Sequence, residues 1–520
     1  CRRSWLSLQK YRDMKIFTKE ERAALDRYSV EEEGVSVSEL INRFAEGVTA
    51  EVMKRLRPAQ PVTVFAGPGN NGADALAVAR MLIDQGVDPL VYLFNVRGNS
   101  LTRDCRDQRE MLLATRRVRL IEIIDSMEPP QLSRDHLIID GLFGSGLRNP
   151  LSGGFMTLVR EINESGADVV SIDLPSGLFP DWNPNSISRN IVHANLTVAA
   201  EYPRLSYFIA DNASLVGQVK LISVGLSKTY AADVPAKYHL VESADITRVL
   251  RLRNPFSTKD DYGTALLVAG SYGMMGAAQF AARGALRAGV GRLLIHSARC
   301  GFNILQTAVP EAMFLPDKND IVVSDIVINR EYSAIGVGSG LGTADATVLA
   351  LDSFLKKYRM PTVLDADALN CIARRPSMLN SLVPGSILTP HAGEFDRLFG
   401  QQQSAEARLI KGVEIARKYK ITLILKGHYT AVIRQDGKIF FNSSGGPAMA
   451  TPGSGDVLTG IVTGLLAQHY EPQIASVAGV YIHGLAGDIA ARDLGPYSVN
   501  ASDIADAIAP AIKSLLITRQ

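Results

Sequence analysis

The sequence contains little cysteine and little tryptophan, and neither sign of charge dominates it. Only four cysteines occur in 520 residues, at positions 1, 105, 300 and 371. They are too far apart to form a metal knuckle or a redox pair and too few for a disulfide framework, so we expect reduced thiols. Lys and Arg number 55 against 53 for Asp and Glu. No overall charge therefore favours binding to nucleic acid or to an anionic membrane.

Long hydrophobic runs are also missing. No eighteen consecutive apolar residues occur, and the N-terminal residues lack the apolar core and small-residue cleavage site of a secretion signal. We therefore expect a cytoplasmic protein without a membrane span. Residues 1–13 are basic and patternless, and we expect them to form an unstructured or non-native leader. The whole chain is 46% hydrophobic and 21% charged, which is ordinary for a globular protein of two to four domains.

The first half of the chain alternates strands and helices. Two helical patterns precede a β-branched strand, and the strands are predicted at 62–66, 90–94, 120–124, 137–140, 169–173, 196–200 and 219–224. Strands separated by helices predict a doubly wound parallel sheet whose ligands bind at the carboxyl ends of the strands. The glycine turn at 67–72 lacks the final glycine of the dinucleotide fingerprint Gly-x-Gly-x-x-Gly, which disfavours hydride transfer.

Three of these strand ends carry polar side chains. Asn71 and Asp74 follow the first strand, Asp140 precedes a glycine-rich loop, and Asp173 opens the segment Asp-Leu-Pro-Ser-Gly. A single turn of this kind is more often structural than functional. Three such turns that can converge on one crevice favour a functional site. The oxygens of Asn71, Asp140 and Ser176 suit a hard cation, and the glycine backbones permit close approach of a pyrophosphate.

Together these three segments resemble the YjeF N-terminal domain, an NAD(P)HX epimerase, over about residues 14–225. The family usually has Asn-Asn-Gly-Gly-Asp-Gly where this chain has Asn-Asn-Gly-Ala-Asp-Ala at 70–75. The resemblance implies a Rossmann-like domain with Asp173 as the catalytic acid–base residue and with K⁺ held by Asn71, Asp140 and Ser176. The contacts that it implies with the hydrated dinucleotide are Asn70, Asn71, Gly72, Ala73, Asp74, Gly144, Ser145, Gly146, Leu147, Arg148, Asn149, Pro150 and Asp173.

A second α/β pattern follows a stretch at 226–244 where the alternation loosens, which we interpret as an interdomain linker. A small-residue helix is predicted at 275–288, and strands are predicted from 264 and at 292–296, 334–337, 362–365, 386–388, 422–426 and 431–434. The motifs of this half differ from those of the first half, so we expect a second domain and not a repeat.

The segment 445–460 places one carboxylate, Asp456, among glycines at the start of an apolar helix. Gly453 and Gly455 lack β-carbons, so backbone N–H groups can converge on an anion, and the helix adds its positive end. Phosphoryl transfer to a hydroxyl needs such donors together with a carboxylate base. A Gly-x-Gly-Asp motif alone is about as often a capped turn as an anion-binding site. The choice between these two interpretations therefore depends on the surrounding motifs.

Four motifs at predicted strand ends precede this segment. They are the glycine run 336–342, the carboxylates of 362–370, the imidazole of 389–395, and a lysine in the tight turn 426–430. A lone histidine or aspartate pair is more often structural, but the order of the motifs, which closes with Asp456, favours one functional site.

That order resembles the YjeF C-terminal domain, a ribokinase-like ADP-dependent NAD(P)HX dehydratase, over about residues 245–517. The resemblance implies Asp456 as the catalytic base, Mg²⁺ in this domain and ADP as phosphoryl donor. The implied contacts with the hydrate are Ala265, Gly340, His391 and Asp456. The implied contacts with the nucleotide are Lys426, Gly427, His428, Tyr429, Thr430 and Gly455.

The expected function is repair of hydrated nicotinamide dinucleotides. The first domain would epimerise R and S NAD(P)HX, and the second would dehydrate the S form with ADP to NAD(P)H, AMP and phosphate. The expected ligands are NADHX or NADPHX and ADP, with no nucleic acid or membrane partner, and the chain is expected to form a homo-oligomer. Two alternatives remain open: a C-terminal small-alcohol (vitamin-precursor) kinase, and a non-catalytic N-terminal binding module. The residues themselves do not exclude ATP.

Overall fold

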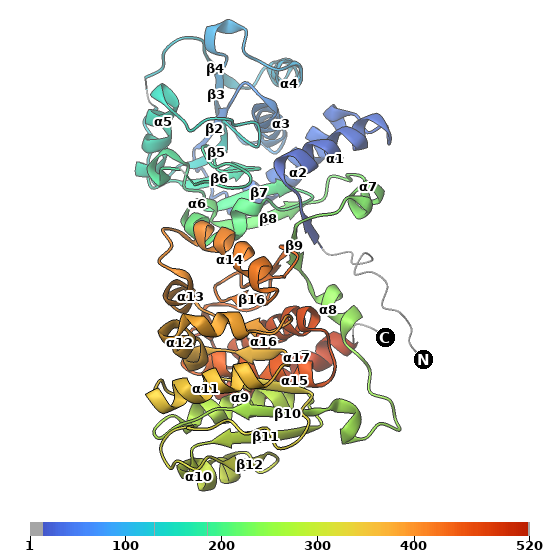
Figure 1. Cartoon of the computed structure of the whole chain (residues 1–520). Helices are drawn as coiled ribbons and strands as arrows, with labels where there is room; N and C mark the ends of the chain where they lie inside the picture. Colours follow the sequence, from blue (N-terminus) through green and yellow to red (C-terminus); the bar gives the residue numbers. More distant parts are fainter. Residues whose placement is uncertain (1–13, 129, 185, 518–520) are drawn as a thin grey trace. The chain divides into compact units, whose positions relative to one another are not determined.

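The computed structural model describes residues 14–128, 130–184 and 186–517 (Figure 1). Residues Lys15–Ala236 and Lys237–Gln520 belong to two compact units. The expected leader 1–13 lies outside the described residues. The expected linker 226–244 contains α7 (Lys228–Asp233), β9 (Tyr238–Val241) and the first residues of α8 (Ser243–Val249), and the division between the units falls within it.

The first unit contains a parallel sheet of the doubly wound type that the sequence predicts. Its strand order is β4-β3-β2-β5-β6-β7-β8. The chain runs outward from β2 to β4, returns to β5 beside β2, and then runs outward to β8, so the topological switch point lies between β2 and β5. The strands are β2 (Val62–Ala66), β3 (Leu90–Phe94), β4 (Arg119–Ile123), β5 (Leu137–Gly141), β6 (Asp168–Ile172), β7 (Leu196–Ala200) and β8 (Gln218–Ile222).

Helices cover both faces of this sheet. The helices are α1 (Lys19–Glu31), α2 (Val37–Arg55), α3 (Asn70–Asp84), α4 (Arg103–Ala114), α5 (Gly153–Glu164) and the short α6 (Ala213–Val216), and a short strand β1 (Met14–Ile16) precedes them. Helices α2, α3 and α4 lie on one face and α5 on the other (Figure 1). Because strand side chains alternate, Val64 packs in the first of these cores and Phe65 in the second. The buried sheet thus presents only its strand ends for chemistry.

The second sheet is mixed, in the order β1-β9-β18-β17-β16-β15-β14-β13-β10-β11-β12. Strand β17 runs antiparallel to both of its neighbours, β16 and β18. The switch point lies between β10 and β13. The strands are β10 (Thr264–Val268), β11 (Arg292–Ser297), β12 (Met313–Pro316), β13 (Ala334–Val337), β14 (Thr362–Leu364), β15 (Ile387–Leu388), β16 (Thr422–Leu425), β17 (Ala431–Ile433) and β18 (Ile439–Asn442).

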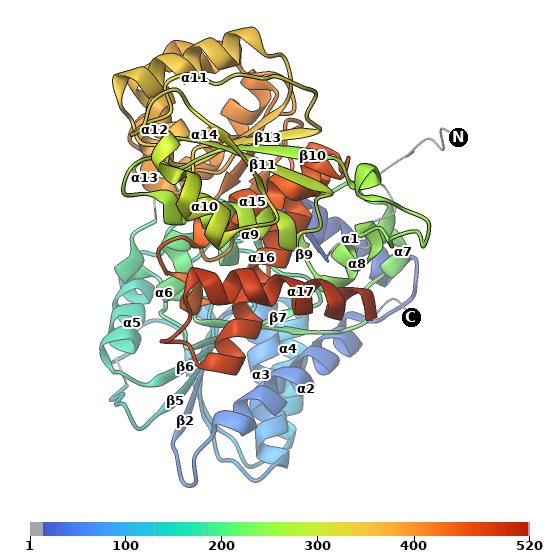
Figure 2. The same ribbon diagram turned by 90° about the horizontal axis from the view of Figure 1, so that it is seen from below.

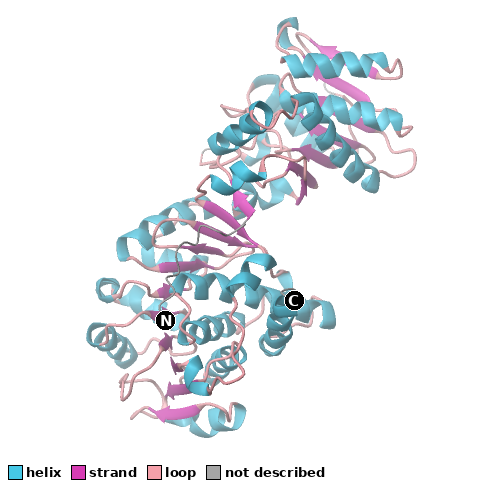
Figure 3. Cartoon of the chain, turned by 90° about the vertical axis from the view of Figure 1, so that its right-hand side faces the viewer, coloured by secondary structure: helices cyan, strands magenta, loops and turns pink. Residues whose placement is uncertain are grey.

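Two layers of helices enclose this second sheet. Figure 2 shows α11 and α12 on one side and α9, α15 and α16 on the other, and in each unit the strands form the inner layer (Figure 3). A β-carbon on Gly460 would fall 1.9 Å from the carbonyl oxygen of Ala281, so α9 and α15 pack backbone to backbone. The helices are α9 (Met275–Arg287), α10 (Phe302–Ala308), α11 (Asp345–Lys357), α12 (Ala366–Arg374), α13 (Ala392–Phe399), α14 (Ala405–Tyr419), α15 (Ser454–Ala467), α16 (Pro472–Leu494) and α17 (Ala501–Ile517).

Helix α16 is the one described helix that is long and apolar enough to cross a membrane by length and composition. In the structure 72% of its most apolar window is buried within the protein, as in the core helix of a globular unit.

Candidate functional sites

A cleft of about 740 Å³ opens in the first unit at the carboxyl ends of β2, β5 and β6, beside the switch point. Its volume is in the range of small-molecule sites. Most of the predicted contacts line it, namely Asn70, Asn71, Asp74, Gly144, Ser145, Gly146, Leu147 and Asp173. The opposite wall comes from α1 and α2, to which the sequence analysis assigned no role. From these helices Arg22, Asp26, Arg27, Leu40 and Phe44 face the cleft.

Other predicted contacts lie away from the cleft surface. Gly72 is buried in the first turn of α3, where a β-carbon would fall 1.8 Å from the carbonyl oxygen of Gly67. Ala73 and Ala75 are fully buried and pack in the core between α3 and the sheet. The two methyl groups that distinguish this chain from the usual glycines therefore fill core space and leave the cleft open. Residues 148–150 are exposed and do not line it.

The proposed metal ligands Asp140 and Ser176 lie together below the cleft, both fully buried. The Ser176 hydroxyl donates to Oδ1 of Asp140 at 2.6 Å, and its backbone N–H donates to Oδ2 at 2.9 Å. The Ser171 hydroxyl (2.8 Å) and the Leu142 N–H (3.3 Å) complete four hydrogen bonds to this carboxylate. Burial raises the pKa of Asp140, and these donors offset part of that rise.

The predicted catalytic residue Asp173 follows β6 and is fixed by several contacts. Arg204 donates to its Oδ1 from Nε at 3.1 Å and from Nη2 at 2.8 Å. The Ser145 N–H lies 3.3 Å from Oδ2. Burial and the charge of Asp173 raise the pKa of Asp74, a second carboxyl group in the same cleft, well above its ordinary value. No local motif pointed to Arg204, because it lies 31 residues after Asp173 in sequence.

In the second unit, most predicted site residues converge where strands end beside the start of α15. Gly340 follows β13, His391 follows β15 and Lys426 follows β16. His391 and Lys426 are paired across a β-bridge. The amino end of α15 reaches this edge, since a β-carbon on Gly455 would lie 3.4 Å from Nζ of Lys426. The glycine cradle and the lysine thus form one site.

Lys426 is held by two acidic side chains that lie in the predicted motifs but received no role from the sequence. Its Nζ lies 2.9 Å from Oδ1 of Asp365, which follows β14, and 3.7 Å from Oε2 of Glu394 in α13. Thr459 of α15 donates to Oδ2 of Asp365 at 2.6 Å. Burial opposes ionisation of Asp365, but the Lys426 ammonium and Thr459 outweigh it and lower the pKa of that carboxyl. The lysine is therefore a fixed positive charge beside the cradle.

Asp456, the predicted base, lies in the first turn of α15. Burial and the charge of Asp365 raise its pKa to about 7, although Ser339 and Lys426 act in the opposite direction. A carboxylate with a pKa near neutrality can accept a proton from a substrate hydroxyl with useful efficiency.

The remaining predicted residues of this unit have varied surroundings. Nδ1 of His391 caps α13 by accepting the N–H of Gly393 at 3.0 Å, which leaves the other ring nitrogen to carry the proton. The turn 427–430 closes through a 2.9 Å hydrogen bond from the Thr430 hydroxyl to the carbonyl of Gly427. The rings of His428 and Tyr429 lie 4.4 Å apart on this partly exposed turn.

Ala265 is not brought to this site. It is fully buried in β10, three residues before the carboxyl end of the strand, a separation of about 10 Å at the rise of a β-strand. The residues that instead border Gly340 are Met274 and Ala277, where α9 starts: a β-carbon on Gly340 would lie 2.5 Å from the Met274 carbonyl oxygen and 2.9 Å from the Ala277 β-carbon. The only sequence signal for them was the glycine turn before a small-residue helix.

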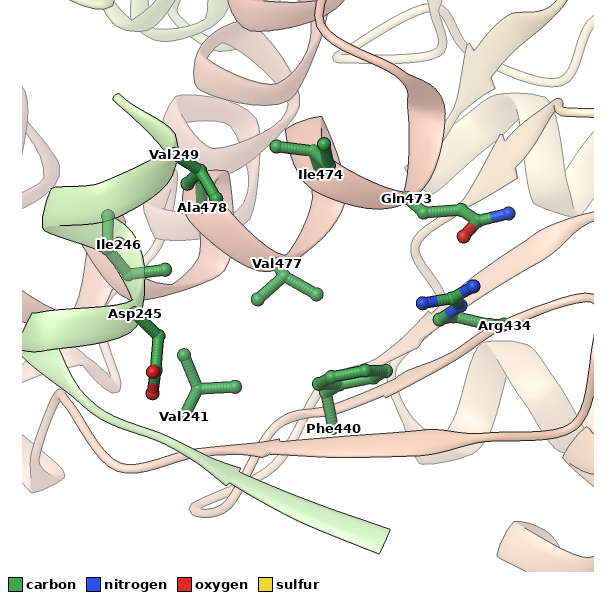
Figure 4. A pocket seen from close by; sticks show the side chains of 10 residues that line it. All are labelled: Val241, Asp245, Ile246, Val249, Arg434, Phe440, Gln473, Ile474, Val477 and Ala478. Atoms are coloured by element: carbon green, nitrogen blue, oxygen red, sulfur yellow. The ribbon is translucent and has the colours of Figure 1, made fainter. Parts of the chain in front are cut away.

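A small apolar hollow of about 30 Å³ lies elsewhere in this unit, between α8, β18 and α16. Figure 4 shows Val241, Ile246 and Val477 around it. Arg434 borders it after the end of β17 that is away from the Lys426 turn. The hollow holds no more than about one water molecule and is not part of the site.

Comparison with known proteins matches both halves of the chain. A family model described as YjeF-related protein N-terminus matches residues 37–206, and one described as NAD(P)H-hydrate dehydratase matches residues 265–510. The bifunctional NAD(P)H-hydrate repair enzyme Nnr of Moorella thermoacetica is 32% identical over 94% of this chain and 92% of its own length. The protein of the same name from Thermofilum pendens is 30% identical, with coverage of 96% and 97%.

Among solved structures, the ADP/ATP-dependent NAD(P)H-hydrate dehydratase of Bacillus subtilis, co-crystallised with ATP and Mg²⁺, is 31% identical. The match covers 53% of this chain and 97% of that one, with a TM-score of 0.47.

Proposed function

Because the chain belongs to the family of bifunctional NAD(P)H-hydrate repair enzymes, we propose that each of its two sites performs one of the two repair reactions. The chain repairs hydrated nicotinamide dinucleotides by epimerisation and dehydration, and a vitamin-precursor kinase is not favoured. We assign epimerisation to the unit that holds Asp173 and dehydration to the unit that holds Asp456. The proposed domains are 14–225 and 245–517.

The observation that carries the dehydratase assignment is the Asp456 carboxyl, with its pKa of about 7, in a glycine cradle beside Lys426. Asp456 takes the proton of the hydrate's hydroxyl while the terminal phosphoryl group of ADP passes to the hydroxyl oxygen, which releases AMP. Phosphate then leaves the ring with a proton from the neighbouring carbon, so the ring double bond re-forms. This route replaces water, a poor leaving group, with phosphate.

Lys426 and the cradle stabilise the charge that spreads over the transferring oxygens. Since Asp365 and Glu394 hold Lys426 in place, the cation needs no reorganisation when the nucleotide binds. We assign Lys426–Thr430 and Gly455 to the nucleotide, and Gly340, His391 and Asp456 to the hydrate. Ala265 would act only as buried support for the strand.

Mg²⁺ would enter this site with the nucleotide. Within residues 14–128, 130–184 and 186–517, no group of three His, Cys, Asp or Glu side chains could hold a metal ion. Mg²⁺ commonly binds substrate phosphates together with one or two carboxylates, and when bound here it would neutralise phosphate charge. The choice between ADP and ATP, a cytoplasmic location and a homo-oligomeric state remain predictions.

In the first unit, Asp173 exchanges a proton with the hydrate while the cleft holds the dinucleotide. Helix α1 adds the exposed Arg27 to the predicted contacts along the cleft wall, and its cation suits the dinucleotide's phosphates.

K⁺ is proposed to bind beside this cleft through Asn71, Asp140 and Ser176. The ligand types fit, because all three side chains offer oxygens, the ligands that hard cations prefer. However, both oxygens of Asp140 already accept two hydrogen bonds each, so the Ser176 hydroxyl would have to turn its proton away from Asp140. When bound, K⁺ would offset the phosphate charge. A K⁺-dependent rise in melting temperature that Na⁺ does not give, and that Asn71→Ala abolishes, would support the site; equal effects of both ions would exclude it.

The function is tested by incubating the chain with mixed R and S hydrates, with and without ADP. Without ADP the two epimers should reach equilibrium faster than in a protein-free control. With ADP both should disappear, and NAD(P)H, AMP and phosphate should form in equal amounts. A stable phosphorylated product would contradict dehydration. Persistence of the R hydrate would mean that the first unit only binds its ligand.

A further inference from the structure

We propose that Arg204 and Tyr207 form a positioning clamp on Asp173, which holds one carboxylate oxygen in a fixed ion pair and leaves the other to exchange the substrate proton. This inference rests on the proposed role of Asp173, and it adds two residues to which no function has been assigned.

Arg204 holds the side chain of Asp173. Both of its hydrogen bonds, from Nε at 3.1 Å and Nη2 at 2.8 Å, go to the same oxygen, Oδ1. Arg204 is only 5% exposed, and a buried planar guanidinium that makes two hydrogen bonds is a rigid partner for a carboxylate. Burial would lower the pKa of Arg204, but the charge of Asp173 outweighs it and raises that pKa, so the arginine remains a cation.

The other oxygen, Oδ2, has a different environment. It accepts a hydrogen bond from the backbone N–H of Ser145 at 3.3 Å, and a β-carbon on Gly144 would lie 3.2 Å from it. Both residues line the cleft together with Asp173. Oδ2 therefore faces the loop that is proposed to contact the dinucleotide, and it is the oxygen that a bound hydrate can reach.

Tyr207 holds the backbone of Asp173. The φ angle of Asp173 is +60°, a left-handed conformation that few residues other than glycine adopt. The Tyr207 hydroxyl donates to the Asp173 carbonyl oxygen, and the Asp173 N–H donates to the carbonyl of Val198 at 2.8 Å. Tyr207 is 3% exposed. Strained backbone persists at functional sites only where the surroundings over-determine it, and these contacts do so.

Both clamp residues come from one segment after β7: Arg204 precedes the 3₁₀ turn Leu205–Phe208, and Tyr207 lies within it. Strand β7 lies beside β6 in the sheet, so the turn is delivered next to the residue that ends β6. Because the segment contacts both the side chain and the main chain of Asp173, we infer that its role is to fix the position of this carboxylate within the cleft.

The test compares Arg204→Met with a matched control, Arg55→Met. Arg55 also donates from Nε (3.1 Å) and Nη2 (2.7 Å) to a carboxylate, that of Asp168 at the other end of β6, but its two bonds go to different oxygens. Epimerisation is followed as loss of the R hydrate in excess ADP. A loss of positioning should lower kcat for R by about 100-fold with KM within threefold, and Arg204→Lys should restore part of kcat. Arg55→Met should leave both parameters unchanged.

Two results would overturn the clamp. If Arg204→Met raises KM while kcat is kept, Arg204 is a substrate contact. If it behaves like Arg55→Met, the ion pair is only structural. Dehydration of the S hydrate by the same protein reports folding of the other unit, and far-ultraviolet circular dichroism reports folding of the whole chain.

If Arg204→Met does not fold, Tyr207→Phe still tests the clamp because it removes a single hydroxyl group. We expect a fall in kcat of about tenfold with KM unchanged, and unchanged kcat would overturn the role of Tyr207. Asp173→Asn separates this inference from the proposed function. If Asp173→Asn retains epimerisation, the catalytic assignment is wrong. If it is inactive while the Arg204 and Tyr207 variants are normal, only the clamp is wrong.

Discussion

Each unit holds a carboxylate that is proposed to act as a base near the switch point of its sheet. The contacts around these two carboxylates differ. Asp173 makes a direct ion pair with buried Arg204. Asp456 lies near Lys426, but the closest ion pairs of that lysine are with Asp365 and Glu394. The negative charge of Asp173 is therefore balanced by a direct contact with the Arg204 cation. Burial and the negative charge of Asp365 tune the second base to a pKa of about 7.

The difference follows from the environment that each reaction needs. In the proposed dehydratase site, Lys426 would stabilise phosphoryl oxygens, and its own acidic partners hold it in place for that role. In the first unit no phosphoryl group is transferred, and the arginine can be committed to the base. The predictions below test this contrast in order of decreasing effect.

The largest effect is expected for Asp456→Asn. Removal of a positioned acid–base group should lower dehydration by about 10²–10⁴-fold, while equilibration of the R and S hydrates continues, because that reaction uses the other unit. The measurement is NAD(P)H formation from S hydrate and ADP, together with the epimer ratio. Dehydration within tenfold of the unmodified protein would remove Asp456 from the role of base.

Lys426→Met should have the next largest effect, because it removes the positive charge at the cradle. We expect dehydration to fall by about 10²–10³-fold, the range found when one transition-state donor is removed, and ADP to lose most of its effect on the melting temperature. Lys356→Met is the control: Lys356 pairs with Asp352 at 2.8 Å in α11, away from the cradle. If both variants lower dehydration equally, the loss of a positive charge anywhere in the unit would explain the fall, and Lys426 would have no special role.

The pH profile of dehydration should report the ionisation of Asp456. Because Asp456 acts as a base only when ionised, kcat/KM for dehydration should rise with pH and reach half its plateau near the pKa of about 7. Lys426 lowers that pKa, so residual activity of Lys426→Met should reach half its plateau at higher pH. A flat profile between pH 5 and 9 would contradict the assignment of Asp456.

The smallest effect concerns stability. The pKa of Asp456 is higher in the folded chain than its ordinary value of 3.8, so between these two pH values the folded chain keeps a proton that the unfolded chain has lost. Stability therefore falls as pH rises through this range and stays lower above about pH 7. Asp456→Asn removes this loss, so its melting temperature relative to the unmodified protein should be higher at pH 8 than at pH 4. Equal differences at both pH values would show that the carboxyl is not strained by burial.

Most of the regular elements could be predicted from local pattern. Strands with β-branched residues, such as β2 and β7, match the prediction residue for residue, because continuous apolar runs of five residues between turns have few alternatives in a buried sheet. β1, β9, β12 and β18 were missed. β12 is an edge strand of partly exposed residues that ends at Pro316, so neither burial nor alternation marks it in the sequence.

The site residues also divide into those that a local motif marks and those that only long-range contacts bring to the site. Asn71, Asp173, Lys426 and Asp456 follow strands or open helices, and a short motif identifies each. Arg204 contacts Asp173 from 31 residues away, and Asp365 contacts Lys426 from 61 residues away. Such partners were not assigned because their side chains meet only when neighbouring strands are aligned in the sheet.

By itself, the sequence determined that the chain has two α/β halves, which motifs mark their strand ends, and which family they resemble, since these depend on residue types at short spacing. Only the tertiary structure decided that Ala73 and Ala75 fill the core and not the cleft, and that Ala265 lies away from the site. It also decided that Arg204 forms an ion pair with Asp173, whereas burial sets the environment of Asp456. Those outcomes depend on which side chains are brought together across the sheets and how deeply they are buried, and neither distance nor desolvation is encoded in any local stretch of the chain.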